Sequence, residues 1–494
     1  MVQQGLATPR TLSMEEYRSD WEPQGWQILV IGPTATWRRE WGEWEAIRDI
    51  VQNALDETED YSWGYDDEGL YIRDIGKGIA VADFLLGPPK PKPDYARGKF
   101  GEGMKIAALT LLRGGYKVRI DTVGREVWVV FLRVKVDGSA DQLAALWRTD
   151  GRRHGTVFHI VGYFGDAFAD RFAVNIPKRD ILHQGPSPIH EPIRRYNQLI
   201  ATPAGRIYAR DIFMREINSP FSYNLWGFAM APDRHGPASE GAMWDDVARL
   251  WATVTDVNLL ERFLGMIKES PDEDSDEARQ VNMNKWNMGK EPATGKYYSE
   301  FINANGDAWR TAWRRKMGEL AVLRTDSRWN NTVAHLGYES ASVSWQTADV
   351  LSLVIKTDTA LVRESQQRLS DAQIMPDESL GPRQLVHLKL ARKIAEKFRP
   401  RIEGLYAAII PPASDRMRTA GLYNKDHREI YISPDQLERA SWTVNTVIHE
   451  IAHHTSGAED LAEAHSEEMT RVAARVVENT AAGLYDEELK EAVW

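Results

Sequence analysis

The sequence contains no cysteine among its 494 residues. Disulfide bonds, thiolate nucleophiles and cysteine-ligated zinc are therefore excluded, and any metal site must use His, Asp or Glu side chains. No stretch approaches 18 consecutive apolar residues, and Met1–Leu12 lacks the basic start and apolar run of a signal peptide. These absences predict a cytoplasmic protein that does not enter a membrane.

The sequence also lacks an excess of positive charge. It has 61 Lys and Arg residues against 72 Asp and Glu residues, which gives a formal net charge of −11. This balance disfavours a general nucleic-acid-binding surface, although a local basic groove stays compatible with it. With 43% hydrophobic and 27% charged residues, the composition is that of a globular protein, and the length predicts two to four domains.

A helix is predicted at Ala46–Glu57, where apolar residues recur at helical spacing and one face can pack on a sheet. On its polar side, Asp49, Asn53 and Asp56 are four and three residues apart and therefore stack along the helix. A carboxylate one turn before an amide suits a base that activates water beside a neutral oxygen ligand for Mg²⁺. Taken alone, the pattern also fits an ordinary amphipathic helix with a polar outer edge.

Two glycine-containing stretches follow this helix. Asp74–Ile79 (D-I-G-K-G-I) comes directly after a strand predicted at Gly69–Ile72, and Gly98–Lys105 (G-K-F-G-E-G-M-K) opens a helix predicted at Ile106–Leu112. A glycine-rich loop that leads into a helix N-terminus presents backbone N–H groups to phosphate oxygens, and glycine permits the close approach. The second stretch therefore predicts a phosphate-binding loop.

In this order, the stretches resemble the nucleotide motifs of the GHKL ATPase superfamily, in particular its DNA gyrase B, MutL and MORC branches. The helix resembles the first motif and Asp74-x-Gly76-x-Gly78 the second, whose aspartate binds the adenine amino group. His154–Ile160 (H-G-T-V-F-H-I) resembles the strand whose threonine, here Thr156, supports that aspartate. The resemblance covers roughly residues 20–190 and implies a Bergerat-type α/β sandwich, with helices on one face of a mixed sheet.

The resemblance also implies roles for individual residues toward ATP and Mg²⁺. Asp49 would activate water and Asn53 would bind Mg²⁺; the nucleotide would contact Asn53, Asp56, Asp74, Gly76, Gly78, Gly98, Gly101, Gly103, Lys105 and Thr156. The family usually has Glu in place of Asp49, and a carboxylate shorter by one methylene leaves the rate of hydrolysis open.

Two further features of the family have candidates here. The proline-rich stretch between Ile79 and Gly98 occupies the position of the family's mobile lid, or is a plain surface loop. Gyrase-like proteins also extend a basic residue from a second domain to the γ-phosphate. Arg234, Lys178 or Arg179 is the candidate, unless each is simply an exposed basic side chain.

A second motif lies in a helix predicted at Thr443–His454 (T-V-N-T-V-I-H-E-I-A-H-H), with Ser441 as its N-cap and Gly457 just past its end. His449 and His453 are four residues apart, so both imidazoles project from one face and can bind one metal ion. Glu450 follows the first histidine, where its carboxylate can accept a proton from a metal-bound water. H-E-x-x-H also occurs by chance, but here it lies within an apolar helix.

Zinc needs a third protein ligand, and the segment after this motif provides candidates. A helix is predicted at Glu459–Val476, in which His465 is the first choice and Asp460 or Glu467 the alternative. The letters H-S-E-E-M from His465 resemble the stretch that follows H-E-x-x-H in SprT-like zinc peptidases, although the gap from His453 is shorter than expected.

The zincin-like resemblance covers about residues 378–494 and implies an edge strand beside the active-site helix, where an extended peptide can pair. The candidate for that strand is His427–Ser433 (H-R-E-I-Y-I-S). The alternative is a degenerate fold in which zinc is only structural.

The chain is thus predicted to be a multidomain α+β protein with four regions. These are an ATP-binding domain (1–190), a transducer-like α/β region (191–270), a helical linker region without recognisable chemistry (271–377) and a zincin-like domain (378–494). Together they predict an ATP-gated zinc metallopeptidase, in which lid closure or homodimerisation controls cleavage of a protein substrate. The alternative is an ATP-dependent clamp or chaperone-like ATPase that acts on DNA or a protein client, with the zinc domain structural.

Overall fold

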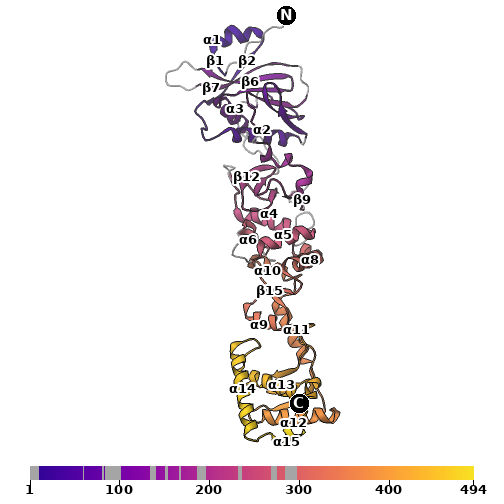
Figure 1. Ribbon diagram of the computed structural model, residues 1–494. Helices are drawn as coiled ribbons and strands as arrows, with labels where there is room; N and C mark the ends of the chain where they lie inside the picture. The colour runs from indigo at the N-terminus through magenta and orange to yellow at the C-terminus, as the bar shows by residue number, and fades with distance from the viewer. Residues whose placement is uncertain are drawn as a thin grey trace. The chain divides into compact units, whose positions relative to one another are not determined.

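The structure is a computed structural model that describes residues 10–58, 60–80, 83, 102–133, 141–150, 154–165, 168–185, 196–231, 236–268, 275–283 and 298–494. The chain is a mixed α+β protein with several sheets, and it forms two compact units, Met1–Asp246 and Val247–Trp494 (Figure 1). The finer division into four regions stays a prediction. Among the described helices, none combines the length and hydropathy that crossing a membrane requires.

The first unit is built around an eight-stranded sheet in the order β2-β7-β6-β5-β8-β4-β3. Neighbours along this path are antiparallel, whereas β1 pairs in parallel with β6, so the sheet is mixed as predicted. The strands are β1 (Thr11–Ser13), β2 (Gln27–Thr34), β3 (Tyr61–Tyr65), β4 (Gly69–Asp74), β5 (Lys117–Thr122), β6 (Arg125–Arg133), β7 (Gln142–Thr149) and β8 (Thr156–Val161).

Two helices, α2 (Glu43–Glu57) and α3 (Gly103–Arg113), cover one face of this sheet (Figure 1). The apolar side of α2 is buried with α3 against side chains of β4, β5 and β8, as the helical spacing of its apolar residues requires. The helices predicted at Ala46–Glu57 and Ile106–Leu112 and the strand predicted at Gly69–Ile72 are confirmed, each a few residues longer.

The segment before β2 covers the opposite face of the sheet. It contains the short helix α1 (Met14–Glu16), and Tyr17, Trp21 and Trp26 pack there against Val130 of β6. Successive residues of a strand point to opposite faces, so the sheet is buried on both sides at this place.

A second, five-stranded sheet in the order β12-β11-β13-β10-β9 follows in the same unit. Its strands are β9 (Ile181–Gln184), β10 (Gln198–Ile200), β11 (Arg206–Ala209), β12 (Ile212–Glu216) and β13 (Ser222–Leu225). The second sheet therefore begins a few residues before the boundary predicted near residue 190.

The second unit begins within α4 (Glu240–Ala252) and continues with short helices. In its core, Phe263 stacks on Trp251 and meets Trp309 edge to face, so these aromatic residues serve packing. The elements are α5 (Val257–Ile267), α6 (Asp276–Gln280), α7 (Tyr298–Ala304), α8 (Gly306–Met317), β14 (Ala321–Leu323), α9 (Asn330–His335), β15 (Glu339–Ala341), α10 (Trp345–Leu351) and α11 (Asp358–Ser370). The predicted helical linker thus also contains a parallel pair of strands, β14 and β15.

The C-terminal part of this unit is a four-stranded sheet packed with helices. The strand order is β16-β17-β19-β18. The elements are β16 (Gln373–Ile374), α12 (Pro382–Ala395), β17 (Gly404–Ile409), β18 (Gly421–Asn424), β19 (Glu429–Ile432), α13 (Ala440–Ser456), α14 (Glu463–Ala481) and α15 (Asp486–Glu491). Helices α12, α13 and α14 bury their apolar sides in one core with β17 and β19.

Three sequence predictions are wrong in detail here. The predicted edge strand is β19, which lies between β17 and β18, so the edge is β18. Ser441 lies inside α13, because the helix begins at Ala440 and its N-cap is Arg439. The second helix begins at Glu463, and the residues before it form a loop after Gly457, whose φ of +66° ends α13 as predicted.

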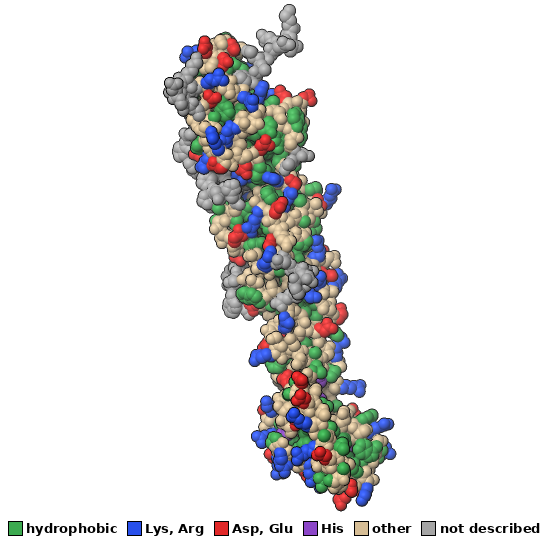
Figure 2. All heavy atoms as spheres, turned by 60° about the vertical axis from the view of Figure 1, so that its left-hand side comes forward, with side chains coloured by type: hydrophobic (Ala, Val, Ile, Leu, Met, Phe, Trp, Pro, Cys, Tyr) green, Lys and Arg blue, Asp and Glu red, His purple; other side chains and the backbone are tan. Residues whose placement is uncertain are grey.

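On the face shown in Figure 2, acidic and basic side chains lie interspersed over the described residues of both units.

Candidate functional site

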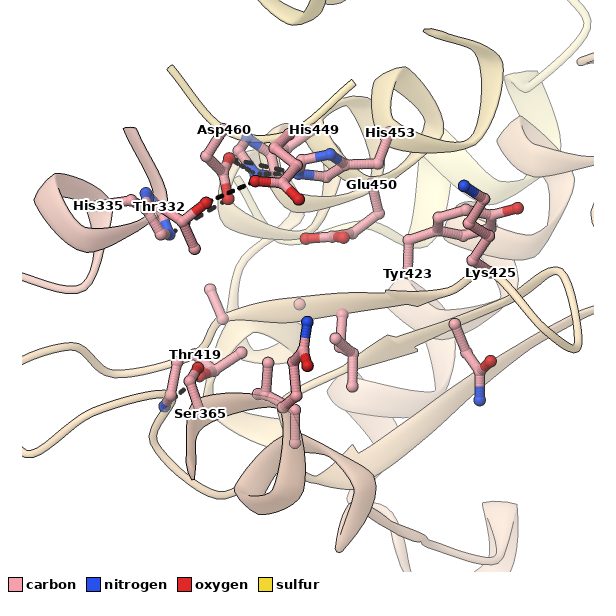
Figure 3. Close-up of a pocket in the computed structure, with 18 of the residues that line it drawn as sticks. Thr332, His335, Ser365, Thr419, Tyr423, Lys425, His449, Glu450, His453 and Asp460 are labelled. Atoms are coloured by element: carbon pink, nitrogen blue, oxygen red, sulfur yellow. Dashed lines mark hydrogen bonds and ion pairs between the residues drawn. The ribbon is translucent and has the colours of Figure 1, made fainter. Parts of the chain in front are cut away.

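Four potential metal donors meet near the C-terminal end of α13, and Figure 3 shows three of them, His449, His453 and Asp460. His449 and His453 come from α13, one helical turn apart, His465 comes from the first turn of α14, and Asp460 comes from the loop between them. The donor atoms of these four residues all lie within 4.8 Å of one another. The structure thus brings together His465 and Asp460, two of the candidates for the third ligand.

The distances between the donors fit a tetrahedral ion. Nε2 of His449 and Nε2 of His453 are 3.2 Å apart, and Oδ1 of Asp460 lies 3.0 Å from the first and 3.3 Å from the second. Metal–ligand bonds of about 2.0–2.1 Å give a tetrahedral edge of roughly 3.3 Å between donors. Nε2 of His465 lies 3.8 Å from Oδ1 of Asp460, slightly beyond this edge.

The second nitrogen of each imidazole decides whether Nε2 is free to bind a metal. In His453, Nδ1 lies 2.9 Å from the carbonyl oxygen of Ala458, which can only accept, so Nδ1 carries the proton and Nε2 has the lone pair. His465 is 2% exposed, and among the described residues neither of its nitrogens has a hydrogen-bond partner. Buried imidazole nitrogens without a hydrogen-bond partner fit the role of a metal ligand.

The neighbouring residue His454 looks equally suited by sequence but is used differently. Its Nε2 lies 2.9 Å from the carbonyl oxygen of Pro400, so that nitrogen carries the proton, and Nδ1 accepts from the hydroxyl of Tyr423, 2.8 Å away. Both nitrogens are occupied, and His454 therefore has a structural role.

The pKa values of His449 and His453 shift upward, whereas that of His465 shifts downward. The hydrogen bond with Asp460 raises the pKa of His449, and the same contact raises the pKa of His453 despite the opposing effect of burial. Burial, reinforced by the two neighbouring imidazoles, lowers the pKa of His465 to about 4. Burial alone would raise the pKa of Asp460, but the hydrogen bonds from His449 and His453 outweigh it and lower that pKa far below its ordinary value.

Glu450 lies beside the donors and is not one of them. Its side chain is 5% exposed, and burial raises the pKa of its carboxyl to about 7. A carboxyl group with a pKa near 7 can accept and return a proton at neutral pH, which suits a general acid–base residue.

Three of the donors, His449, His453 and Asp460, line a pocket of about 810 Å³ together with Glu450 (Figure 3). One wall of the pocket is formed by the edge strand β18 and the preceding residues Thr419 and Ala420. Another wall is the face of α11 that carries Ser365 and Leu369. Among the described strands, β18 pairs only with β19, so its other edge has the geometry with which an extended chain could pair.

Two residues of this site were missed by the sequence analysis, and one candidate falls outside it. His335 and Thr332 of α9 contact the loop that carries Asp460, although α9 lies in the region predicted to have no chemistry. Nothing in the sequence marks them, since Thr332 and its partner Glu459 are 127 residues apart. Glu467 is 60% exposed at its side chain and pairs with Arg471, so it is not part of the donor group.

In the first unit, the structure places two groups of predicted nucleotide residues along α2. Asp49 is buried, and Nδ2 of Asn53 donates to its Oδ2 over 3.4 Å. A Cβ on Gly103, the first residue of α3, would lie only 1.8 Å from Oδ2 of Asp49. The predicted base, the predicted magnesium ligand and the end of the predicted phosphate loop therefore meet at one place.

The second group lies near the C-terminal end of α2, where Oε1 of Glu57 accepts from the backbone N–H of Lys77. Oδ1 of Asp74 accepts from the backbone N–H of Gly76 over 2.8 Å, and Thr156 is its partner in the β4–β8 register. The hydroxyl of Thr122 lies 3.3 Å from that of Thr156, a contact that the sequence did not indicate. Burial raises the pKa of Asp74 even though backbone hydrogen bonds from Gly76 and Thr156 oppose the shift.

The remaining predicted nucleotide residues are placed only in part. Gly78 has a φ of +84°, which explains glycine in the second motif, and Asp56 lies half-buried on α2. Lys105 is 4% exposed, and burial lowers the pKa of its ammonium group. Gly98, Gly101, Arg234 and most of the predicted lid lie outside the described residues.

The chain matches no known family model, and no curated protein sequence matches it either.

Proposed function

We propose that this chain is an ATP-gated zinc metallopeptidase. The observation that carries the proposal is the convergence of three histidines, His449, His453 and His465, beside the buried Glu450 at the wall of a pocket. These residues would hold Zn²⁺, which would supply a Lewis acid that polarises a peptide carbonyl and lowers the pKa of water.

The chain's own residues have matching roles. Glu450 takes a proton from the attacking water and returns it to the leaving amine, for which a pKa of about 7 is suited. The free edge of β18 pairs with an extended peptide and orients it past Glu450. The carbonyl of Ala458 fixes the orientation of His453, as second-shell partners of metal ligands do.

The ATP-dependent half of the proposal is supported by the first unit. A GHKL-like site binds the adenine amino group at Asp74 and Mg²⁺ at Asn53, with Asp49 orienting water. Lid closure or homodimerisation on ATP binding then controls cleavage of a protein substrate in the second unit.

A second function is favoured by one observation. With Asp460 included, the donor group has four members, and closed four-donor zinc sites are structural. In that case the chain is an ATP-dependent clamp or chaperone-like ATPase for a protein client or DNA, and zinc only stabilises the second unit.

The experiment that separates the two functions compares three proteins with and without ATP·Mg²⁺: wild type, Glu450→Gln and Asn53→Ala. Metal content is measured together with cleavage of casein and of the chain itself. Zinc near one per chain, with cleavage that needs Glu450 and is changed by Asn53→Ala, supports the gated peptidase. Zinc without cleavage under any nucleotide condition, and unchanged ATP-dependent activity in Glu450→Gln, supports the clamp.

A further inference from the structure

Helix α9 precedes the predicted metal domain in sequence, yet it contacts the loop that carries Asp460 (Figure 3). Nε2 of His335 lies 3.2 Å from Oδ2 of Asp460, and the hydroxyl of Thr332 donates to the carboxylate of Glu459. The other oxygen of Asp460, Oδ1, faces the metal-binding histidines. The two oxygens of one carboxylate therefore have separate partners, the metal site on one side and α9 on the other.

We propose that Asp460 is a reversible fourth metal ligand and that His335 holds it in the coordination sphere. The inference rests on the proposed zinc site and identifies what controls access to it. With Asp460 bound, four protein donors complete a tetrahedral site and leave no position for substrate. With Asp460 withdrawn, three histidines remain, which is the ligand set of an open catalytic zinc site.

The backbone next to Asp460 favours release. Leu461 has a φ of +65°, a left-handed conformation that is unfavourable for a residue with a branched side chain. Its side chain is 60% exposed, so packing does little to hold this conformation. The contacts of Glu459 and Asp460 hold it instead, and withdrawal of Asp460 lets the backbone relax.

The pocket lies next to Asp460, so a substrate in it could reach the coordination position that Asp460 would vacate. Asp460, His335 and Glu450 all line it, and 23% of the Asp460 side chain is exposed. Withdrawal of Asp460 therefore opens a coordination position toward the same pocket that Glu450 lines. Since α9 belongs to the part of the chain that precedes the metal domain, a displacement of α9 would reach the metal site through Asp460, which His335 contacts directly.

The test uses the full chain loaded with Co²⁺, whose visible spectrum reports coordination number, and acetohydroxamate as a probe for an open position. We expect wild type to show a four-coordinate spectrum that the probe barely changes. Asp460→Ala should give an altered spectrum and bind the probe at least about tenfold more tightly. His335→Ala should shift in the same direction and lose zinc affinity by about 10–100-fold, the usual effect of removing a second-shell partner. The matched control is His427→Ala, an exposed histidine outside the pocket.

The outcomes distinguish this inference from the proposed function. A wild-type chain that binds neither Zn²⁺ nor Co²⁺ overturns both. Metal binding in wild type, with an unchanged spectrum and probe affinity in Asp460→Ala, overturns the fourth ligand alone. A His335→Ala protein that matches His427→Ala overturns the role of His335. Asp460→Asn preserves the shape of the side chain but is a weaker metal donor, so it should behave like Asp460→Ala if the effect comes from loss of a ligand. Circular dichroism of the metal-free proteins checks that the variants are folded.

Discussion

The substitution Gly421→Ala tests whether the edge strand β18 positions Glu450, the proposed acid–base residue. Gly421 has an ordinary backbone conformation, so alanine introduces no backbone strain there. Its Cβ, however, would lie 2.7 Å from Oε1 of Glu450 and 2.6 Å from Cγ2 of Thr446. Ordinary contacts begin near 3.4 Å, so Glu450 must move by roughly 0.7 Å.

The expected loss follows from this displacement. A misplacement of about 1 Å in a catalytic group can lower the rate about 10²-fold, so we expect kcat/KM to fall by tens of fold up to about 100-fold. The stability cost of such overpacking is about 1–3 kcal/mol. Zinc content should stay at the wild-type level, because the three atoms nearest to the new methyl group belong to Thr446 and Glu450 and not to the four donors.

The assay measures kcat/KM on a peptide that wild type cleaves, zinc content and thermal unfolding. Gly381→Ala is the matched control, since its Cβ would meet only Oε1 of Gln384, at 3.6 Å. Wild-type kcat/KM in Gly421→Ala would refute the position assigned to Glu450. A loss of zinc in Gly421→Ala would show that the change acts on the fold and not on Glu450 alone.

Three further predictions concern the nucleotide residues and the metal. Gly103→Ala should abolish most ATP hydrolysis, because its Cβ would overlap the carboxylate of Asp49. The control is Gly241→Ala, whose Cβ has its nearest atom 3.9 Å away. Equal ATPase rates in the two variants would contradict the placement of Asp49 beside Gly103. Asp74→Asn should abolish ATP binding, measured by calorimetry, yet raise the melting temperature at neutral pH. The pKa of Asp74 is raised in the folded state, so protonated Asp74 stabilises the fold below its unfolded pKa, and this stabilisation is lost as pH rises through the raised pKa. The gain in melting temperature from Asn should therefore become smaller as the pH is lowered toward the ordinary aspartate pKa of 3.8. Removal of zinc by a chelator should lower the free energy of unfolding of the second unit, by about 2.7 kcal/mol when zinc had been present at 100 times its Kd, and a chelator-insensitive melting curve would argue against the site.

Local pattern was sufficient for the elements that carry the predicted motifs. The spacing of apolar residues predicted α2 and α3, and the glycine after α13 predicted its end, because these signals act within a few residues. The geometry of H-E-x-x-H likewise follows from helical periodicity alone. What the pattern cannot contain is strand order: β18 has only four residues and begins with glycine, and its place at the edge is fixed by pairing with β19.

The same limit explains why the ligand set stayed open between His465, Asp460 and Glu467. The three lie close together in sequence, and their fates differ because α14 begins at Glu463. That start leaves Asp460 in a loop against α13 and turns Glu467 toward solvent, while His465 is buried in the first turn of the helix. A shift of the helix start by a few residues would exchange these roles, and sequence patterns locate helix ends only to within that error.

The contrast between His453 and His454 shows what decides whether an imidazole nitrogen is available to a metal ion. The two residues are adjacent on α13, and in each of them one ring nitrogen donates to a backbone carbonyl oxygen, which fixes the proton on that nitrogen. For His453 the carbonyl faces Nδ1, so Nε2 is left for the metal site; for His454 it faces Nε2, and the remaining Nδ1 is taken by Tyr423. The choice is therefore made by Ala458 and Pro400, whose carbonyls decide which nitrogen is left free. His335 stands in the same relation to Asp460, with one oxygen engaged so that the other faces the donors, and it would make the composition of the metal site depend on a helix that precedes the domain.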